Sequence, residues 1–275
     1  MRSALTLLST LLLMGCSNNN QTDQSKSIAI FNQAYQENFQ PDTLETILSK
    51  AINAYVLIDP FDLEENLTQK IPTIKAKGNQ LAGYISVGTG ETWRTDFQAL
   101  QPYLATQEWA EWEGEYYVSE TTTGILEIMQ QRIDRLAQWG FDWVEFDNMD
   151  WFTPETKTTY NLQLTQEDAK EYIHTLCAYT HAKGMKCMAK NTVEGFDEFD
   201  GVLYESSHQN QNWWDHEGMR QFLEAGKLVI INHYNESDCD AIYDSYKAYY
   251  QHEGISFICE DTQLQAYRHY NLDTE

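Results

Sequence analysis

The chain has 275 residues, of which 42 are acidic and 18 are basic, so its formal net charge is −24. Nucleic acid is excluded as a partner, because its phosphates bind clusters of Lys and Arg that a strongly acidic chain lacks. The negative charge favours accumulation of a cationic ligand. The solubility of an exported acidic protein is an alternative explanation of the same charge.

The N-terminus predicts a processing segment. Arg2 supplies a positive charge, residues 5–14 are largely apolar, and Cys16 ends the segment. The apolar stretch is shorter than the about 20 residues that a membrane-spanning helix needs. Its end resembles a bacterial lipobox, which predicts residues 1–16 as a lipoprotein signal peptide, lipidation of Cys16, and an extracytoplasmic protein held at a membrane, the outer one if the cell has two. An ordinary secretory signal with an incidental Cys is the alternative.

Residues 17–27 are polar and lack apolar periodicity, so they predict a flexible tether before one domain over residues 28–275. Eight apolar runs in that domain predict strands buried on both faces: residues 54–58, 81–85, 116–118 (the weakest), 143–146, 185–189, 202–204, 228–231 and 255–259. Between them, Thr165 and Asp168 form a helix capping pattern, and Gly140, Gly184 and Gly226 indicate helix ends. Doubly buried strands that alternate with helices predict a (β/α)8 TIM barrel.

Polar residues gather at the C-terminal ends of these runs, where the active sites of such barrels lie. Alternation in the fourth run predicts that its apolar residues face the helices, while Glu145 and Asp147 face the barrel axis. Carboxylates inside a barrel are costly unless they are paired or functional, and Lys190 and Arg94 are candidate partners. On position alone, catalysis and a capped strand end that holds loops in place explain Asp147 equally well.

Glu205 is a second carboxylate at a strand end, after residues 202–204. Hydrolysis of a glycosidic bond uses two carboxyl groups, one ionised and one protonated, and acids on the fourth and sixth strands would face each other across the mouth. A salt bridge to a loop is the alternative for Glu205. Asp59 and Asp62 form a further acidic corner that is predicted to hold sugar hydroxyls or an amine. Four aromatic residues in the loops either pack those loops or stack on sugar rings: Trp93, Trp151, Trp213 and Trp214.

No nucleophile elbow, phosphate-binding glycine loop or HExxH motif occurs, so no metal or cofactor is expected. Cys239 and Cys259 are predicted to lie near each other, which leaves a disulfide between them open. Cys177 falls within a helix and Cys187 within the next strand. Helix and sheet backbones pack roughly 10 Å apart, whereas a disulfide needs Cα atoms within about 7 Å, so this second pair is predicted to be buried thiols.

Five blocks of sequence, at residues 58–62, 84–94, 140–150, 181–191 and 199–205, resemble glycoside hydrolase family 114, the endo-α-1,4-polygalactosaminidases. The resemblance implies a (β/α)8 barrel that cleaves α-1,4-linked galactosamine or N-acetylgalactosamine polymers of biofilm matrices. It places the family's catalytic Asp on Asp147, as nucleophile, and its catalytic Glu on Glu205, as acid/base. Residues in or beside the blocks, together with Tyr234 near the seventh strand, are expected to bind substrate: Asp59, Asp62, Tyr84, Arg94, Asn148, Asp150, Trp151, Lys190, Asn191 and Tyr234.

The sequence thus predicts a lipid-anchored glycoside hydrolase that acts within a polysaccharide chain and retains the anomeric configuration. Retention predicts carboxyl groups about 5–5.5 Å apart, against roughly 6.5–9.5 Å for inversion. Two alternatives stay open, namely a carbohydrate-binding barrel without activity and a hydrolase of another α-linked glycan such as an α-galactoside.

Overall fold

The computed structural model describes residues 28–34, 49–61, 64–205, 216–242, 244, 254–261 and 267–269. The predicted signal peptide, the tether, Cys16, Asp62, Trp213 and Trp214 lie outside the described residues. In the described part of the chain, no helix is both long enough and apolar enough to cross a membrane.

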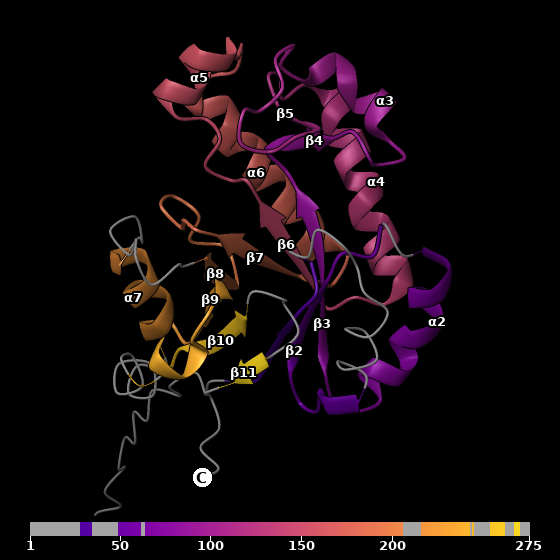
Figure 1. Cartoon of the computed structure of the whole chain (residues 1–275). Helices are drawn as coiled ribbons and strands as arrows, with labels where there is room; N and C mark the ends of the chain where they lie inside the picture. The colour runs from indigo at the N-terminus through magenta and orange to yellow at the C-terminus, as the bar shows by residue number, and fades with distance from the viewer. Residues whose placement is uncertain are drawn as a thin grey trace, which may run out of the picture.

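The described strands form a barrel that is nearly closed (Figure 1). Eight parallel strands follow one another around it, and a ninth is added antiparallel to the last. The first and eighth strands approach each other, where the Ile28 N–H donates to Ser256 Oγ at 3.0 Å. In sheet order the strands are β1 (Ile30–Asn32), β2 (Tyr55–Ile58), β3 (Gln80–Ser86), β6 (Trp143–Asp147), β7 (Lys186–Lys190), β8 (Gly201–Glu205), β9 (Leu228–Glu236), β10 (Ser256–Asp261) and the antiparallel β11 (Tyr267–His269).

The barrel prediction is confirmed, but two of its strands were assigned wrongly. The first strand is β1, which the sequence did not reveal, and residues 116–118 do not form the third strand. Instead, β5 (Glu115–Tyr117) pairs antiparallel with β4 (Thr89–Glu91) in a separate hairpin. Tyr116 of β5 is only half-buried, because this hairpin lacks the layers that cover both faces of a barrel strand. The two errors cancel in the count, so β6 and β8 are the fourth and sixth strands as predicted.

Helices pack around the barrel and extend beyond one of its ends (Figure 1). Helix α4 buries Ile125, Met129, Ile133 and Leu136, which recur at helical spacing and therefore share one face. Helix α6 begins with the predicted capping box, in which Thr165 and Asp168 each accept a hydrogen bond from the other's backbone N–H. The helices are α2 (Glu64–Lys75), α3 (Phe97–Leu100), α4 (Thr123–Trp139), α5 (Pro154–Tyr160), α6 (Gln166–Ala182) and α7 (His216–Glu224), with a 3-10 helix η1 (Gln101–Tyr103) after α3.

Two apolar clusters make up the core, one between strands and helices and one inside the barrel. Strand β6 contributes to both, because Val144 and Phe146 lie in the outer cluster and Trp143 in the inner one. The fully buried Glu145 has the inward parity of Trp143, as alternation predicted. The members of the inner cluster are Ile30, Tyr55, Leu57, Ala82, Tyr84, Trp143, Met188, Leu203, Ile230 and Ile258.

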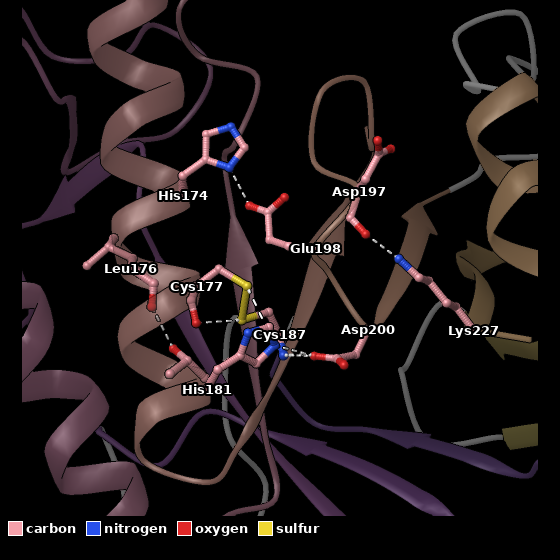
Figure 2. The surroundings of a disulfide bond; sticks show 10 residues. His174, Leu176, Cys177, His181, Cys187, Asp197, Glu198, Asp200 and Lys227 are labelled. Atoms are coloured by element: carbon pink, nitrogen blue, oxygen red, sulfur yellow. Dashed lines mark hydrogen bonds and ion pairs between the residues drawn. A yellow bond between two sulfur atoms is a disulfide. The ribbon is translucent and has the colours of Figure 1, made fainter. Parts of the chain in front are cut away.

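Two disulfides are present among the described residues. Cys239 and Cys259 are bonded, with Cα atoms 5.7 Å apart. Cys177 and Cys187 are also bonded, with a Cα–Cα distance of 5.8 Å, so the prediction of free thiols was wrong. The short turn between α6 and β7 holds the end of the helix against the start of the strand, closer than average layer spacing suggests (Figure 2). Disulfides form in oxidising compartments, which indicates an extracytoplasmic protein.

Candidate active site

The C-terminal ends of β6, β7 and β8 bring two carboxylates to one lysine. The Nζ atom of Lys190 lies 3.0 Å from Asp147 Oδ1 and 3.2 Å from Glu205 Oε1. A third carboxylate, Glu145, lies deeper in the barrel, with its Oε1 atom 3.9 Å from the same nitrogen. Lys190 is buried, whereas the side chains of Asp147 and Glu205 are 16% and 22% exposed. The predicted catalytic pair therefore meets at the mouth, with solvent access, above a buried cation.

The charge of this cluster depends on Lys190. Burial alone would lower the pKa of Lys190, but the carboxylates of Asp147, Glu205 and Glu145 raise it above its usual value. The lysine is thus held as an ammonium ion. Because one ammonium faces three carboxylates, the mouth favours a cation.

Two asparagines hold the carboxylates of the predicted catalytic pair, one through its backbone and one through its side chain. Asn148 follows β6 and Asn191 follows β7, and both have left-handed backbones, with φ of 57° and 63°, a conformation that Asn adopts more readily than most residues. The Asn148 N–H donates to Asp147 Oδ1 at 2.8 Å. Asn191 Nδ2 donates to Glu205 Oε2 at 3.0 Å, and Asn191 Oδ1 accepts from the Glu205 N–H at 2.9 Å. Each turn therefore fixes one carboxylate at the mouth.

Tyr84 at the end of β3 is a further partner of Asp147. Its hydroxyl donates to Asp147 Oδ2 at 2.7 Å. Burial, followed by repulsion from Asp147, Glu91 and Glu115, raises the pKa of Tyr84 well above its usual value. The phenol therefore keeps its proton and acts as a donor. Asp147 receives bonds from backbone, hydroxyl and ammonium groups, which together fix the direction of its oxygens.

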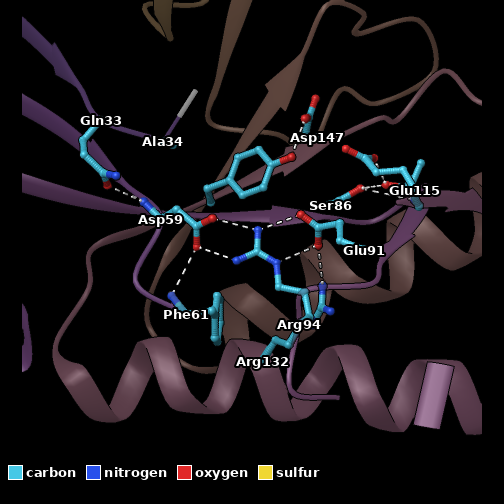
Figure 3. A network of polar contacts seen from close by, with 12 residues as sticks. Gln33, Ala34, Asp59, Phe61, Ser86, Glu91, Arg94, Glu115, Arg132 and Asp147 are labelled. Atoms are coloured by element: carbon cyan, nitrogen blue, oxygen red, sulfur yellow. Dashed lines mark hydrogen bonds and ion pairs between the residues drawn. The ribbon is translucent and has the colours of Figure 1, made fainter. Parts of the chain in front are cut away.

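Asp59 and Arg94 pair with each other beside this cluster (Figure 3). Two guanidinium nitrogens of Arg94 donate to Asp59 at 2.9 and 2.7 Å, and Arg94 also binds Glu91 at 2.9 and 2.6 Å. Burial alone would lower the pKa of Arg94, but Glu91 and Asp59 raise it above its usual value. Arg132 of α4 continues the network, with two bonds of 2.8 Å to Asp96. Lys190 and Arg94 were the two predicted partners of Glu145 and Asp147. Lys190 contacts both acids, whereas Arg94 binds Asp59 and Glu91 instead.

Asp150 and Trp151 follow strand β6, which carries Asp147. Asp150 retains solvent contact, yet the surrounding protein desolvates it and, with the nearby charges of Asp147 and Glu205, raises its pKa. Trp151 is 2% exposed, and its indole N–H donates to the Val118 carbonyl at 2.9 Å. Trp151 thus supports the loop from below. Tyr234 lies on β9, but its side chain is outside the described part of the structure.

Sequence reasoning missed a carboxylate that the β4–β5 hairpin brings near the mouth. Glu115 Oε2 accepts from the Thr89 hydroxyl at 2.6 Å, and that hydroxyl is 2.6 Å from Ser86 Oγ. Asn148 Nδ2 donates to Ser86 Oγ at 3.0 Å, so hydrogen bonds connect Glu115 to the residue after Asp147. Burial, followed by repulsion from Glu91 and Asp147, raises the pKa of Glu115 to about 7, although the Thr89 bond opposes this. The sequence held one indication of this carboxylate, namely that Glu115 directly precedes residues 116–118, which were wrongly assigned to the third barrel strand.

Side chains of metal-ligand type gather elsewhere in the described structure, at Cys177, His181 and Cys187. Both sulfurs are bonded to each other, and His181 Nε2 lies 2.8 Å from Asp200 Oδ2 (Figure 2). Cys187 lies near the N-terminal end of β7, whereas Lys190 ends that strand at the mouth. This group is therefore separate from the carboxylate cluster.

An eight-stranded parallel barrel with two solvent-accessible carboxylates at its mouth has the pair of groups that glycoside hydrolysis uses. The chain belongs to glycoside-hydrolase family GH114, whose model matches residues 22–274. The match spans the whole barrel and both carboxylates. Membership of this family makes the protein a hydrolase that acts on a glycan.

The solved structures that are similar to the chain include the following three. The Ega3 protein of Aspergillus fumigatus, in complex with galactosamine, matches with a TM-score of 0.69 and 20% identity over 90% of this chain and 95% of that one. The glycoside hydrolase domain of PelA from Pseudomonas aeruginosa matches with a TM-score of 0.62 and 16% identity, over 87% and 96% of the two chains. An α-galactosidase from Thermus thermophilus matches with a TM-score of 0.56 and 11% identity, over 86% and 58%.

At these identities the likeness is one of fold. No curated protein sequence gives a significant match to the chain.

Proposed function

We propose that the protein is a retaining, endo-acting hydrolase of α-1,4-linked galactosamine and N-acetylgalactosamine polysaccharides. The observation that carries this proposal is the pair of carboxylates, Asp147 and Glu205, held against Lys190. Family membership supplies the reaction class. The sugar is suggested by galactosamine in the Ega3 complex and by the excess of carboxylates at the mouth, which would attract a protonated amine.

In this proposal Asp147 attacks the anomeric carbon while Glu205 gives its proton to the leaving oxygen. The glycosidic bond breaks as an ester forms between the sugar and Asp147. Glu205 then takes a proton from water, which attacks the anomeric carbon and releases Asp147. The hydrogen bonds that Tyr84 and Asn148 donate to Asp147 keep one of its oxygens directed for attack.

The Lys190 distances favour retention over inversion. Since both carboxylates contact one nitrogen, at 3.0 and 3.2 Å, the two contacting oxygens are no farther apart than the sum of these distances. The separations typical of inverting enzymes, measured between whole carboxyl groups, begin at roughly 6.5 Å, so oxygens that share one lysine fit the closer spacing of a retaining pair better.

Several neighbours of the pair are proposed to contact the sugar. Asp150 and Asn191 adjoin the catalytic carboxylates, and Lys190 neutralises part of their charge. Asp59 is proposed to act with Arg94 at the wall beside Tyr84, where Arg94 lies 5.9 Å from the centre of the Tyr84 ring. Asp62 and Tyr234 are proposed as further sugar contacts. Asp62 and the side chain of Tyr234 lie outside the described structure.

Incubation with partly deacetylated galactosaminogalactan, followed by mass spectrometry of the released oligomers, tests the activity. Oligomers of several lengths at early times, with the α-anomer formed first by NMR, are the expected products. Release of galactose alone would favour an α-galactosidase. Binding of the polymer without release of any product would favour a carbohydrate-binding barrel.

We also propose that Cys16 carries a lipid anchor and that residues 17–27 tether the barrel to the membrane. The lipobox resemblance at residues 13–16 supports this address, and the two disulfides agree with an extracytoplasmic location. A tether of this kind would let a membrane-held enzyme reach an extracellular polysaccharide.

A further inference from the structure

The side-chain amide of Asn232 on β9 is buried and makes no hydrogen bond within the described part of the chain. The residue is fully buried, and neither its Oδ1 nor its Nδ2 atom has a hydrogen-bond partner there. Asn79 shows what a buried asparagine normally achieves. Its amide donates to the Ala51 and Ile74 carbonyls, each at 2.9 Å, and accepts from the Ala54 N–H at 2.9 Å. Asn232 therefore stands out among buried asparagines, because nothing in the described fold uses its polar atoms.

The position of Asn232 places it beside the acid/base carboxylate. In β9, Ile230 packs inside the barrel while Val229 and Ile231 pack outside, so alternation turns Asn232 inward. Its register partner on β8 is Glu205, and neighbouring strands lie about 4.8 Å apart. Glu205 keeps solvent contact through 22% of its side chain. A sugar that reaches Glu205 therefore comes within one strand spacing of Asn232.

A buried amide without hydrogen bonds lowers the stability of the free protein, because no bond within the protein replaces the bonds that the amide makes with water in the unfolded chain. Such a group is explained where a ligand supplies the missing bonds. We infer that Asn232 is a substrate-contacting residue whose amide binds a ring hydroxyl of the sugar held at Glu205. A hydroxyl both donates and accepts, as the amide does, whereas an ammonium only donates and would be drawn to the carboxylates. The choice of a sugar as the ligand rests on the proposed function. The lack of hydrogen bonds at the Asn232 side chain does not depend on it.

Asn232→Leu removes both polar atoms and keeps a similar shape, and Asn79→Leu is the matched control. The first variant should raise the melting temperature of the unliganded protein by about 2–5 °C, because it deletes unpaired polar atoms. The second should lower the melting temperature, because it removes the hydrogen bonds that the Asn79 side chain makes with the Ala54 N–H and with the Ala51 and Ile74 carbonyls. Opposite signs for one substitution at two buried asparagines are the first expected result.

Sugar binding is then measured by NMR titration with galactosamine, N-acetylgalactosamine and galactose. Asn232→Leu should weaken all three by at least about tenfold, since all carry ring hydroxyls, and Asn79→Leu should bind them as wild type does. The inference is overturned if Asn232→Leu destabilises the free protein, if it binds the sugars unchanged, if only galactosamine binding is lost, or if wild type binds none of them. Polymer hydrolysis by wild type is scored separately, so loss of the proposed activity would leave a sugar contact through Asn232 standing.

Discussion

The raised pKa of Glu115 predicts that one substitution will change how stability depends on pH. The ordinary pKa of a glutamate side chain is 4.5, and the fold raises the pKa of Glu115 to about 7. A raised folded-state pKa means that the folded protein holds this proton more tightly than the unfolded chain does. The contribution of Glu115 to stability is therefore fully present below about pH 4.5 and is lost as the pH rises to about 7.

The size of this loss follows from the shift. Each pKa unit corresponds to about 1.4 kcal/mol, so ionisation of Glu115 should cost up to about 3 kcal/mol, less if the hairpin relaxes. Glu115→Gln removes the titration and keeps an acceptor for the Thr89 hydroxyl. Relative to wild type, this variant should gain about 2–3 kcal/mol in free energy of unfolding between pH 5 and pH 8.

Urea unfolding at half-unit steps of pH measures this difference, with the exposed Glu113→Gln as the matched control. The control should follow the wild-type curve, because it removes a charge from the same loop without removing a buried carboxyl. If the Glu115→Gln and wild-type curves run parallel from pH 5 to pH 8, the account of Glu115 is wrong.

Three further predictions concern catalysis, the fold and the address. Asp147→Asn should abolish hydrolysis of polymer, measured by reducing ends, with an unchanged circular dichroism spectrum; near wild-type rates would remove it as nucleophile. Cys239→Ser opens a loop with a sequence separation of 20 and should cost roughly 3 kcal/mol in urea unfolding, whereas an unchanged midpoint would show that the bond does not constrain the unfolded chain. Cys16→Ser should move the protein from the membrane fraction to the soluble one, because it removes the residue that is proposed to carry the acyl chains of the anchor. Retention of the variant in membranes would exclude the lipid anchor.

The sequence was most informative where burial on both faces constrains it. The apolar positions of β6 and the acids between them indicated the fold and the direction of Glu145 and Asp147, because strand alternation is rigid. Glu205 was placed at the mouth because it ends the sixth strand. The resemblance to family 114 was confirmed by the match over residues 22–274.

The remaining features depend on contacts that no local pattern specifies. Strand β1 is only Ile30–Asn32, too short to show a period. Glu115 is far from Asp147 in sequence. It reaches the mouth because the β4–β5 hairpin pairs it with Glu91. The bond between Cys177 and Cys187 depends on the local approach of α6 to β7, which an average layer spacing misrepresents. The unpaired state of Asn232 is likewise visible only once its surroundings are known.

The central claim is that Asp147 forms a covalent bond to the sugar while Glu205 handles the proton. It is tested most directly in Glu205→Gln, treated with a dinitrophenyl α-galactosaminide whose leaving group needs no protonation. The first step should still proceed, while the second slows for want of a base, so a glycosyl-enzyme should accumulate. Peptide mapping by mass spectrometry should find one galactosamine residue on Asp147. A burst of dinitrophenol with the sugar on another residue, or turnover with no adduct at any time point, would contradict the account.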